Sequence, residues 1–110
     1  MDVAHADQID GDFAPAVAPS VSSVELEGEA VLYDEATETV HRLNPTAALA
    51  WACFDGSATI DELASDMAAV FGADEASVQA DLVVLCRRLG GLGLLAGVAA
   101  NTAKPAGETA

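Results

Sequence analysis

The first periodic stretch of the chain alternates between apolar and polar residues, a pattern typical of β-strands. Within residues 21–26, Val24 and Leu26 lie on one face of an extended chain, whereas Glu25 lies on the other. Alternation of this kind indicates a strand that is buried on one side and solvated on the other. We therefore expect a half-buried strand here, with Val24 and Leu26 directed toward the core.

Two more strands are predicted directly after this one. They span Glu29–Tyr33 and Thr39–Leu43, and the second begins with two β-branched residues. The dipeptide Glu27-Gly28 is a plausible tight turn, because glycine adopts a positive φ without a Cβ clash. A polar segment, residues 34–37, separates the second predicted strand from the third. Three short antiparallel strands in sequence predict a β-meander.

The pattern changes to helical spacing after residue 43. Asn44 is a preferred N-cap and Pro45 a preferred first helical residue, so a helix is predicted from there to about residue 54. Thr59 and Glu62 form a capping box that opens a second helix. Asp74 caps a third and longer helix that runs to about residue 89. The order β-β-β-α-α-α predicts an α+β fold of the winged helix-turn-helix type.

Two faces of the third predicted helix carry apolar residues. The first is a narrow stripe that we interpret as core, formed by Val78, Leu82, Leu85, Leu89 and Leu92. The second is a shoulder about 80 to 140° around the helix, formed by Gln79, Val83, Cys86 and Gly90. A surface helix usually places charged residues at such positions. The shoulder therefore either contacts the first two helices or forms a binding surface, and the pattern leaves both interpretations open.

The two ends of the chain lack hydrophobic periodicity. Residues 1–20 contain four aspartates, two prolines and one aromatic residue, so we predict a disordered acidic arm. Residues 97–110 are small and polar, which predicts a flexible tail. The folded domain is therefore expected over residues 21–96, and 110 residues allow only one small domain.

Charge and cysteine content exclude several classes of function. The chain has 18 acidic and 4 basic residues and a formal net charge of −14, which argues against nucleic acid or an anionic membrane as a partner. Cys53 and Cys86 lie far apart without a CxxC motif, so neither a disulfide framework nor a zinc site is indicated. The acidic N-terminus does not resemble a signal peptide, and the apolar run 89–100 is too short to span a bilayer. We expect a cytoplasmic protein.

The sequence contains few residues that could together form a catalytic site. It has two histidines, His5 and His41, and no phosphate-binding or metal-binding motif, so we predict no catalytic residues, cofactor or metal. One alternative is a winged-helix transcriptional regulator, although the acidic first half of the third helix does not suit DNA. A more distant alternative is an acidic carrier protein tethered through Ser57, but three N-terminal strands do not suit a four-helix carrier.

Several motifs in a fixed order resemble the PqqD family over about residues 22–96. They are Val31-Leu32-Tyr33-Asp34, the run from Val40 to Ala48 that contains Leu43-Asn44-Pro45-Thr46, the segment Asp55 to Thr59, and Asp81 with Leu85, Leu89, Gly93, Leu94 and Leu95. The resemblance implies a small winged helix-turn-helix domain that recognises ribosomally made precursor peptides. Such a domain is not an enzyme. It binds the leader region of the peptide and presents the rest to a modifying enzyme, such as a radical SAM protein or a leader peptidase.

The resemblance also implies a mode of binding. The leader would pair as an added strand with the third strand of the meander and place its side chains against the third helix. On this basis the expected peptide-binding residues are Thr39, Val40, His41, Arg42, Leu43, Gln79, Leu82, Val83, Cys86 and Arg87. Val83 and Cys86 would receive apolar leader residues, and the two arginines would pair with leader carboxylates.

Overall fold

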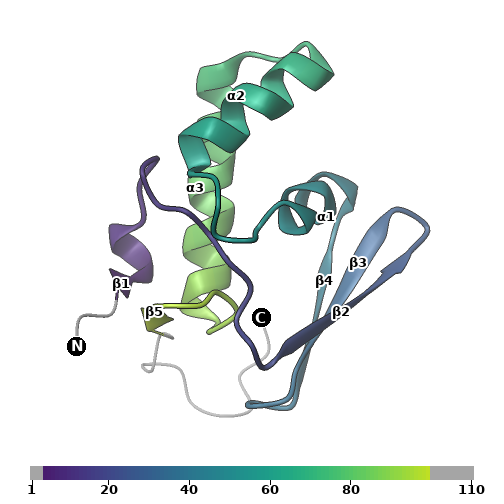
Figure 1. Ribbon diagram of the computed structural model, residues 1–110. Helices are drawn as coiled ribbons and strands as arrows, with labels where there is room; N and C mark the ends of the chain where they lie inside the picture. Colours follow the sequence, from purple (N-terminus) through teal and green to yellow (C-terminus); the bar gives the residue numbers. More distant parts are fainter. Residues whose placement is uncertain (1–3, 100–110) are drawn as a thin grey trace.

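A computed structural model describes residues 4–99 of the chain (Figure 1). Three strands are followed by three helices, and short elements at both ends complete the fold. Their order is β1 (Ala4–His5), η1 (Ala6–Gln8), β2 (Val21–Leu26), β3 (Glu29–Asp34), β4 (Thr39–Leu43), α1 (Pro45–Ala52), α2 (Ile60–Phe71), α3 (Glu75–Gly91) and β5 (Val98–Ala99). The predicted α+β fold, with a three-stranded meander before three helices, is confirmed.

The meander is an antiparallel sheet in the order β2-β3-β4. Its strands coincide with the predicted ones, except that β3 extends by one residue to Asp34. Both residues of the predicted tight turn have positive φ, 52° for Glu27 and 84° for Gly28, as a type I′ hairpin requires. The turn residues therefore determine the register of the first hairpin, in which Leu26 lies opposite Glu29.

All three helices begin at the predicted caps. The Asn44 side chain accepts a hydrogen bond from the backbone N–H of Ala47 at 2.8 Å, and Asp74 accepts one from Ser77 at 3.0 Å. The capping box of Thr59 and Glu62 is also formed. The first helix ends two residues earlier than expected and the third ends two residues later, which is the usual uncertainty of helix ends.

The core lies between one face of the sheet and the helices. Figure 1 shows α1 between the sheet and the pair formed by α2 and α3. Leu32 of β3 and Leu43 of β4 are fully buried on the side of the sheet that α1 covers, and Trp51 and Phe54 meet edge to face at the end of α1. Leu89 of α3 is also completely buried.

The opposite side of the sheet carries apolar residues in solvent. This outer face consists of Val24, Leu26, Val31, Tyr33 and Val40, which the strand register brings together in adjacent rows. Val24 is 59% exposed and Leu26 is 56% exposed. The prediction that these two residues point into the core is therefore wrong. The helices cover β3 and β4 but leave β2 uncovered, so the polar face of β2 is exposed as well.

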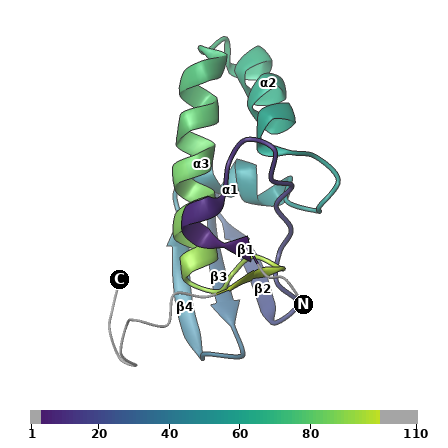
Figure 2. The same ribbon diagram turned by 90° about the vertical axis from the view of Figure 1, so that its left-hand side faces the viewer.

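The N-terminal arm, residues 4–20, packs against the helices, in contrast to the expected disorder. Ile9 is 1% exposed and belongs to the hydrophobic core. Arg87 of α3 donates a hydrogen bond to the carbonyl oxygen of Ile9 at 2.9 Å. Figure 2 shows η1 and β5 against the C-terminal half of α3. A Cβ on Gly90 would lie 2.8 Å from Val98 and 3.3 Å from Ile9, so glycine in this helix permits the close approach of both segments.

Backbone hydrogen bonds explain why an acidic segment without periodicity is ordered. The carbonyl oxygens of Gly11 and Phe13 accept hydrogen bonds from Asp61 and Ile60, whose N–H groups have no partner within α2. Further along, Ala18 donates to Leu94 at 3.0 Å. The arm thus completes the N-terminal cap of α2, an interaction that hydrophobic spacing does not reveal.

The end of the described chain differs from expectation only after residue 96. Leu94 and Leu95 are buried, as their place in the predicted domain implies, but Val98–Ala99 pairs in parallel with β1. The predicted flexible tail therefore begins with an ordered strand, and residues 100–110 of that prediction lie outside the described residues, as do residues 1–3 of the arm. No helix within residues 4–99 is long and apolar enough to cross a membrane.

The packing of the arm leads to a testable prediction. Replacing Ile9 with Ala should lower the free energy of unfolding by about 2 to 4 kcal/mol, because the substitution leaves a cavity in the core. Replacing the exposed neighbour Asp12 with Ala should change it by less than about 0.5 kcal/mol. Urea denaturation of both variants measures the difference. Equal stability of the two variants would show that the arm does not contribute to the core.

Candidate functional site

One edge of the sheet is unpaired beside the helices. Strand β4 pairs with β3, and no other strand within residues 4–99 pairs with its second edge. Thr39, His41 and Leu43 share the side of the sheet that faces the helices, whereas Val40 and Arg42 lie on the outer face. The free N–H and C=O groups of β4 form a template for another extended chain.

The opposite edge of the same sheet offers less to an added strand. The inward positions of β2 are Val21, which is half-buried at the start of the strand, and Ser23 and Glu25, which are both exposed because the helices leave most of this strand uncovered. An extended peptide on β2 would find hydrogen bonds but no apolar wall for its side chains. Strand β4 therefore forms the better edge for recognition, since specificity in strand addition comes from side-chain pockets.

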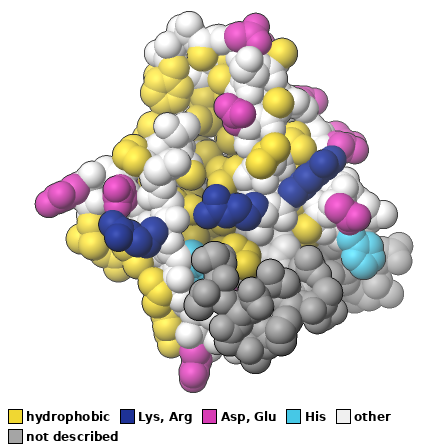
Figure 3. All heavy atoms as spheres, turned by 180° about the vertical axis from the view of Figure 1, so that it is seen from behind, with side chains coloured by type: hydrophobic (Ala, Val, Ile, Leu, Met, Phe, Trp, Pro, Cys, Tyr) yellow, Lys and Arg dark blue, Asp and Glu magenta, His cyan; other side chains and the backbone are white. Residues whose placement is uncertain are grey.

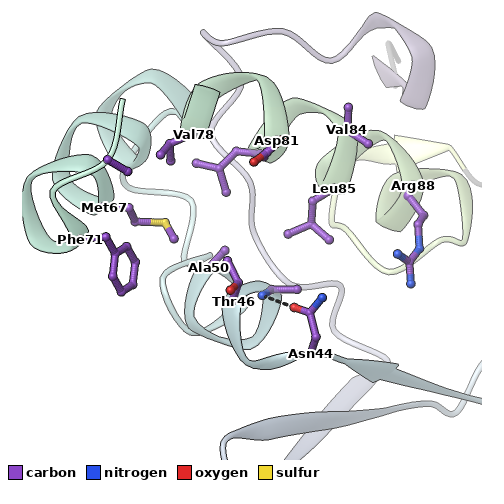
Figure 4. A pocket seen from close by; sticks show the side chains of 13 residues that line it. Asn44, Thr46, Ala50, Met67, Phe71, Val78, Asp81, Val84, Leu85 and Arg88 are labelled. Atoms are coloured by element: carbon purple, nitrogen blue, oxygen red, sulfur yellow. Dashed lines mark hydrogen bonds between the residues drawn. The ribbon is translucent and has the colours of Figure 1, made fainter. Parts of the chain in front are cut away.

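An apolar groove adjoins the β4 edge. It has a volume of about 480 Å³ and lies between α1, α2 and α3. Figure 4 shows side chains from all three helices around this space. The main apolar side chains are Met67 and Phe71 from α2 with Val78, Leu82, Val84 and Leu85 from α3. Val84 is 66% exposed and Phe71 is 52% exposed, so large apolar surface is accessible to a ligand.

Asn44 and Arg88 connect the groove with the strand edge. Asn44 directly follows β4 and lines the groove. Arg88 also lines it, and its charge acts on His41 of β4. Partial burial is the main cause of a lowered pKa of His41; Arg88 lowers it further, whereas the negative charge of Asp34 opposes the shift. His41 is also within hydrogen-bond distance of the Thr39 hydroxyl, at 3.0 Å. The groove and the free edge therefore form one continuous surface.

The three arginines of the described chain lie on one face of the molecule, which Figure 3 shows in dark blue. Arg42 is paired with Glu29 at 2.7 Å on the outer face. Arg87 is paired with Asp10 of the arm at 3.3 Å. Arg88 has no ion pair with any of residues 4–99. It is thus the one arginine of this part of the chain that has no intramolecular ion pair, and it lines the groove.

The ten predicted peptide-binding residues do not all lie at the free edge or the groove. All five residues of β4 lie on the free edge strand, and Leu82 lies at the base of the groove with 4% exposure. Gln79 and Val83 are half-buried and do not line the groove. Cys86 is completely buried, and burial raises the pKa of its thiol to about 12. The expectation that Cys86 is accessible to a leader side chain is therefore corrected, whereas the role of Arg87 in peptide binding stays a prediction.

The physical reason for this correction is the position of the arm. The shoulder of α3 that we considered as a binding surface includes Cys86 and Gly90, and Ile9 and Ala6 of the arm approach Gly90. Arg87 holds the same segment through its hydrogen bond to Ile9. At Cys86 and Gly90 the shoulder is thus covered by the N-terminal arm, which neither interpretation of the sequence pattern included.

Sequence reasoning missed the residues that line the groove from the other side of α3. Val84, Leu85 and Arg88 are the main ones, with Met67 and Phe71 from α2. Leu85 was assigned to the core stripe, but it is only partly buried. One signal was present: Val84 departs from the spacing of the stripe and has no periodic reason to be apolar.

The site contains no arrangement typical of metal or covalent chemistry. Within residues 4–99, no group of three or more His, Cys, Asp or Glu side chains could hold a metal ion. The features that converge at the groove are apolar walls, a neighbouring unpaired strand, the cation of Arg88 and the carboxylate of Asp81. This combination suits the binding of an extended peptide.

Comparisons with known proteins agree with this geometry. Residues 29–95 match the sequence model of the family described as "Coenzyme PQQ synthesis protein D (PqqD)". Among solved structures, TbiB1 in complex with the TbiA(beta) leader peptide is similar, with a TM-score of 0.69 and 25% sequence identity over 76% of this chain and 98% of that chain. A search of curated proteins found no match. The chain belongs to the PqqD family, whose proteins are non-catalytic, peptide-binding chaperones.

Proposed function

We propose that this protein binds the leader segment of a ribosomally synthesised precursor peptide and presents the peptide to a modifying enzyme. The observation that carries the proposal is the continuity of the unpaired β4 edge with the apolar groove. The similar protein TbiB1, whose structure includes a leader peptide, supports it.

The leader binds as a fourth strand along β4. Each backbone hydrogen bond of such a ladder contributes about 0.5 to 1.5 kcal/mol net, so a five-residue strand provides useful but unselective affinity. The arrangement also removes the unpaired edge that the free protein exposes.

Selectivity comes from the groove. A leader strand that continues past Asn44 reaches the space between α1, α2 and α3, where apolar leader side chains contact Phe71, Val84 and Leu85. Burial of one large apolar side chain contributes about 1.5 to 3 kcal/mol, which is more than one ladder hydrogen bond. Leaders without apolar residues in this register are therefore rejected.

Arg88 adds an electrostatic requirement. It lies at the end of the groove next to β4 and has no acidic partner within the described chain. A carboxylate of the leader at this point pairs with Arg88, while the formal net charge of −14 repels acidic peptides that bind elsewhere. The charge pattern thus selects where the acidic residue of the leader lies.

The groove leads to a first prediction on binding. Replacing Val84 with Asp places a charge in the apolar groove and should weaken leader binding by at least about tenfold. Because Val84 is 66% exposed, the fold should tolerate the change. Isothermal titration with the leader of the precursor encoded beside this chain measures the affinity.

Val70→Asp is the matched control. Val70 is 78% exposed on α2 and does not line the groove, so this variant should bind like the unmodified protein.

Hydrogen exchange of the β4 amides should slow when leader is added. Absence of leader binding by the unmodified protein, or protection confined to other strands, contradicts the proposed function.

Arg88 leads to a second prediction. Arg88→Glu should weaken the binding of a leader with an acidic residue by about tenfold, and a leader with that acidic residue changed to Lys should recover part of the affinity. In the free protein, Arg88→Gln should raise the pKa of His41, because it removes a cation that lowers it. An NMR titration of His41 reports this shift. An unchanged pKa would place Arg88 away from β4.

A further inference from the structure

The outer face of the sheet is an apolar surface that extends from β4 across β3 to β2, well beyond the edge proposed to bind the leader. Its exposed members are Val24, Leu26, Tyr33 and Val40, of which Tyr33 is 39% and Val40 is 62% exposed. The register places Val24 opposite Val31, and Tyr33 opposite both Ser22 and Val40, so the side chains form one patch. In a solvent-exposed sheet face, polar residues are the usual occupants. Contiguous apolar patches of this kind are typical of interaction surfaces.

A hollow at one end of the outer face is lined by two glutamates, one arginine and two apolar residues. Its volume is about 380 Å³, and its walls are Leu26, Glu27, Glu29, Val31 and Arg42. Glu29 is already paired with Arg42, whereas Glu27 has no ion pair within residues 4–99. The aliphatic stem of a lysine or arginine would pack on Leu26 and Val31, with its charged end at Glu27.

Two glutamates at the ends of the outer face adopt an unfavourable backbone conformation. Glu27, in the turn between β2 and β3, has a φ of 52°, and Glu38, in the turn between β3 and β4, has a φ of 57°. Glycine or asparagine is less strained at such positions. A strained backbone retained with a charged side chain points to a use for the charge. Both glutamates are exposed and place negative charge at opposite ends of the apolar patch.

These charges decide which partner fits. A second copy of this chain would bring its own acidic turns and a net charge of −14 against the same patch, so self-association through this face is unfavourable. A partner with an apolar centre and a basic rim is complementary.

We propose that the outer face is the docking surface of the enzyme that modifies the bound peptide, and that a lysine or arginine of this enzyme enters the hollow beside Glu27. The identity of the partner rests on the proposed function. A leader strand added to β4 extends the same sheet, so a protein on the outer face lies next to Val40 and beside the bound peptide. One surface therefore holds the enzyme while the other side of the sheet and the groove hold the leader.

The test uses variants that separate the two surfaces. Val24→Asp changes a 59% exposed residue on β2, the strand farthest from the leader edge, and Val70→Asp on α2 is the matched control. Binding of the modifying enzyme encoded beside this chain is measured by biolayer interferometry, and leader affinity is measured on the same samples. We expect Val24→Asp to weaken enzyme binding by at least about tenfold and to leave leader affinity unchanged.

Glu27→Asn is the second variant. An Asn-Gly pair is favoured in a type I′ turn, so the thermal midpoint should stay equal or rise. Enzyme binding should nevertheless weaken by about threefold or more, because the charge beside the hollow is lost. A loss of binding without a loss of stability separates a role in docking from a role in folding.

Each other outcome has a defined meaning. Unchanged enzyme binding by Val24→Asp, or no enzyme binding by the unmodified protein, overturns the docking surface. A dimer in sedimentation velocity that Val24→Asp converts to monomer also overturns it, because the occupant is then a second copy. Failure of the leader to bind refutes the proposed function, whereas leader binding without enzyme binding refutes only the docking surface.

Discussion

The packing of the N-terminal arm on α3 is the interaction on which the rest of the site depends. Helix α3 has apolar residues on more than one side, and a small domain cannot bury all of them with three short strands and two other helices. The arm covers the side of Cys86 and Gly90, with Ile9 in the core and Arg87 holding its backbone. The side of Val84 and Leu85 then remains open as the groove.

This division places each arginine in a different setting. Arg87 contacts the arm, Arg42 pairs with Glu29 on the outer face, and Arg88 has no ion pair with any of residues 4–99. Arg88, the direct neighbour of Arg87 in sequence, points to the groove because successive residues of a helix differ by about 100° in direction. Arg87 therefore contributes to the fold, whereas the adjacent Arg88 lines the groove.

The sheet has a similar division between its two sides. Its inner side contributes Leu32 and Leu43 to the core, and its outer side carries an exposed apolar patch with acidic ends. The free edge of β4 borders both sides of the sheet. A peptide that pairs with this edge would join the groove to the outer face, and the proposed docking surface places the modifying enzyme where it meets that peptide.

Local features of the sequence determined the elements and their order. Asn44-Pro45, the Thr59–Glu62 capping box and Glu27-Gly28 each act through hydrogen bonds or backbone angles within a few residues. The three strands of the meander, the three helices and the first tight turn could therefore be predicted, whereas β1, η1 and β5 were missed. The family resemblance likewise identified β4 as an edge. These inferences needed no knowledge of which faces meet.

Only the tertiary structure decided which faces are buried. Alternation in β2 shows that Val24 and Glu25 lie on opposite sides, but not which side the helices cover. The same holds for α3, where the spacing describes two apolar stripes. Both stripes are largely buried, and the groove opens instead at Val84 and Arg88, which belong to neither. Because the arm is held by backbone carbonyls of Gly11 and Phe13 at the start of α2, side-chain patterns carry no sign of its position. Burial depends on contacts between distant segments, and these contacts decided where the apolar groove lies.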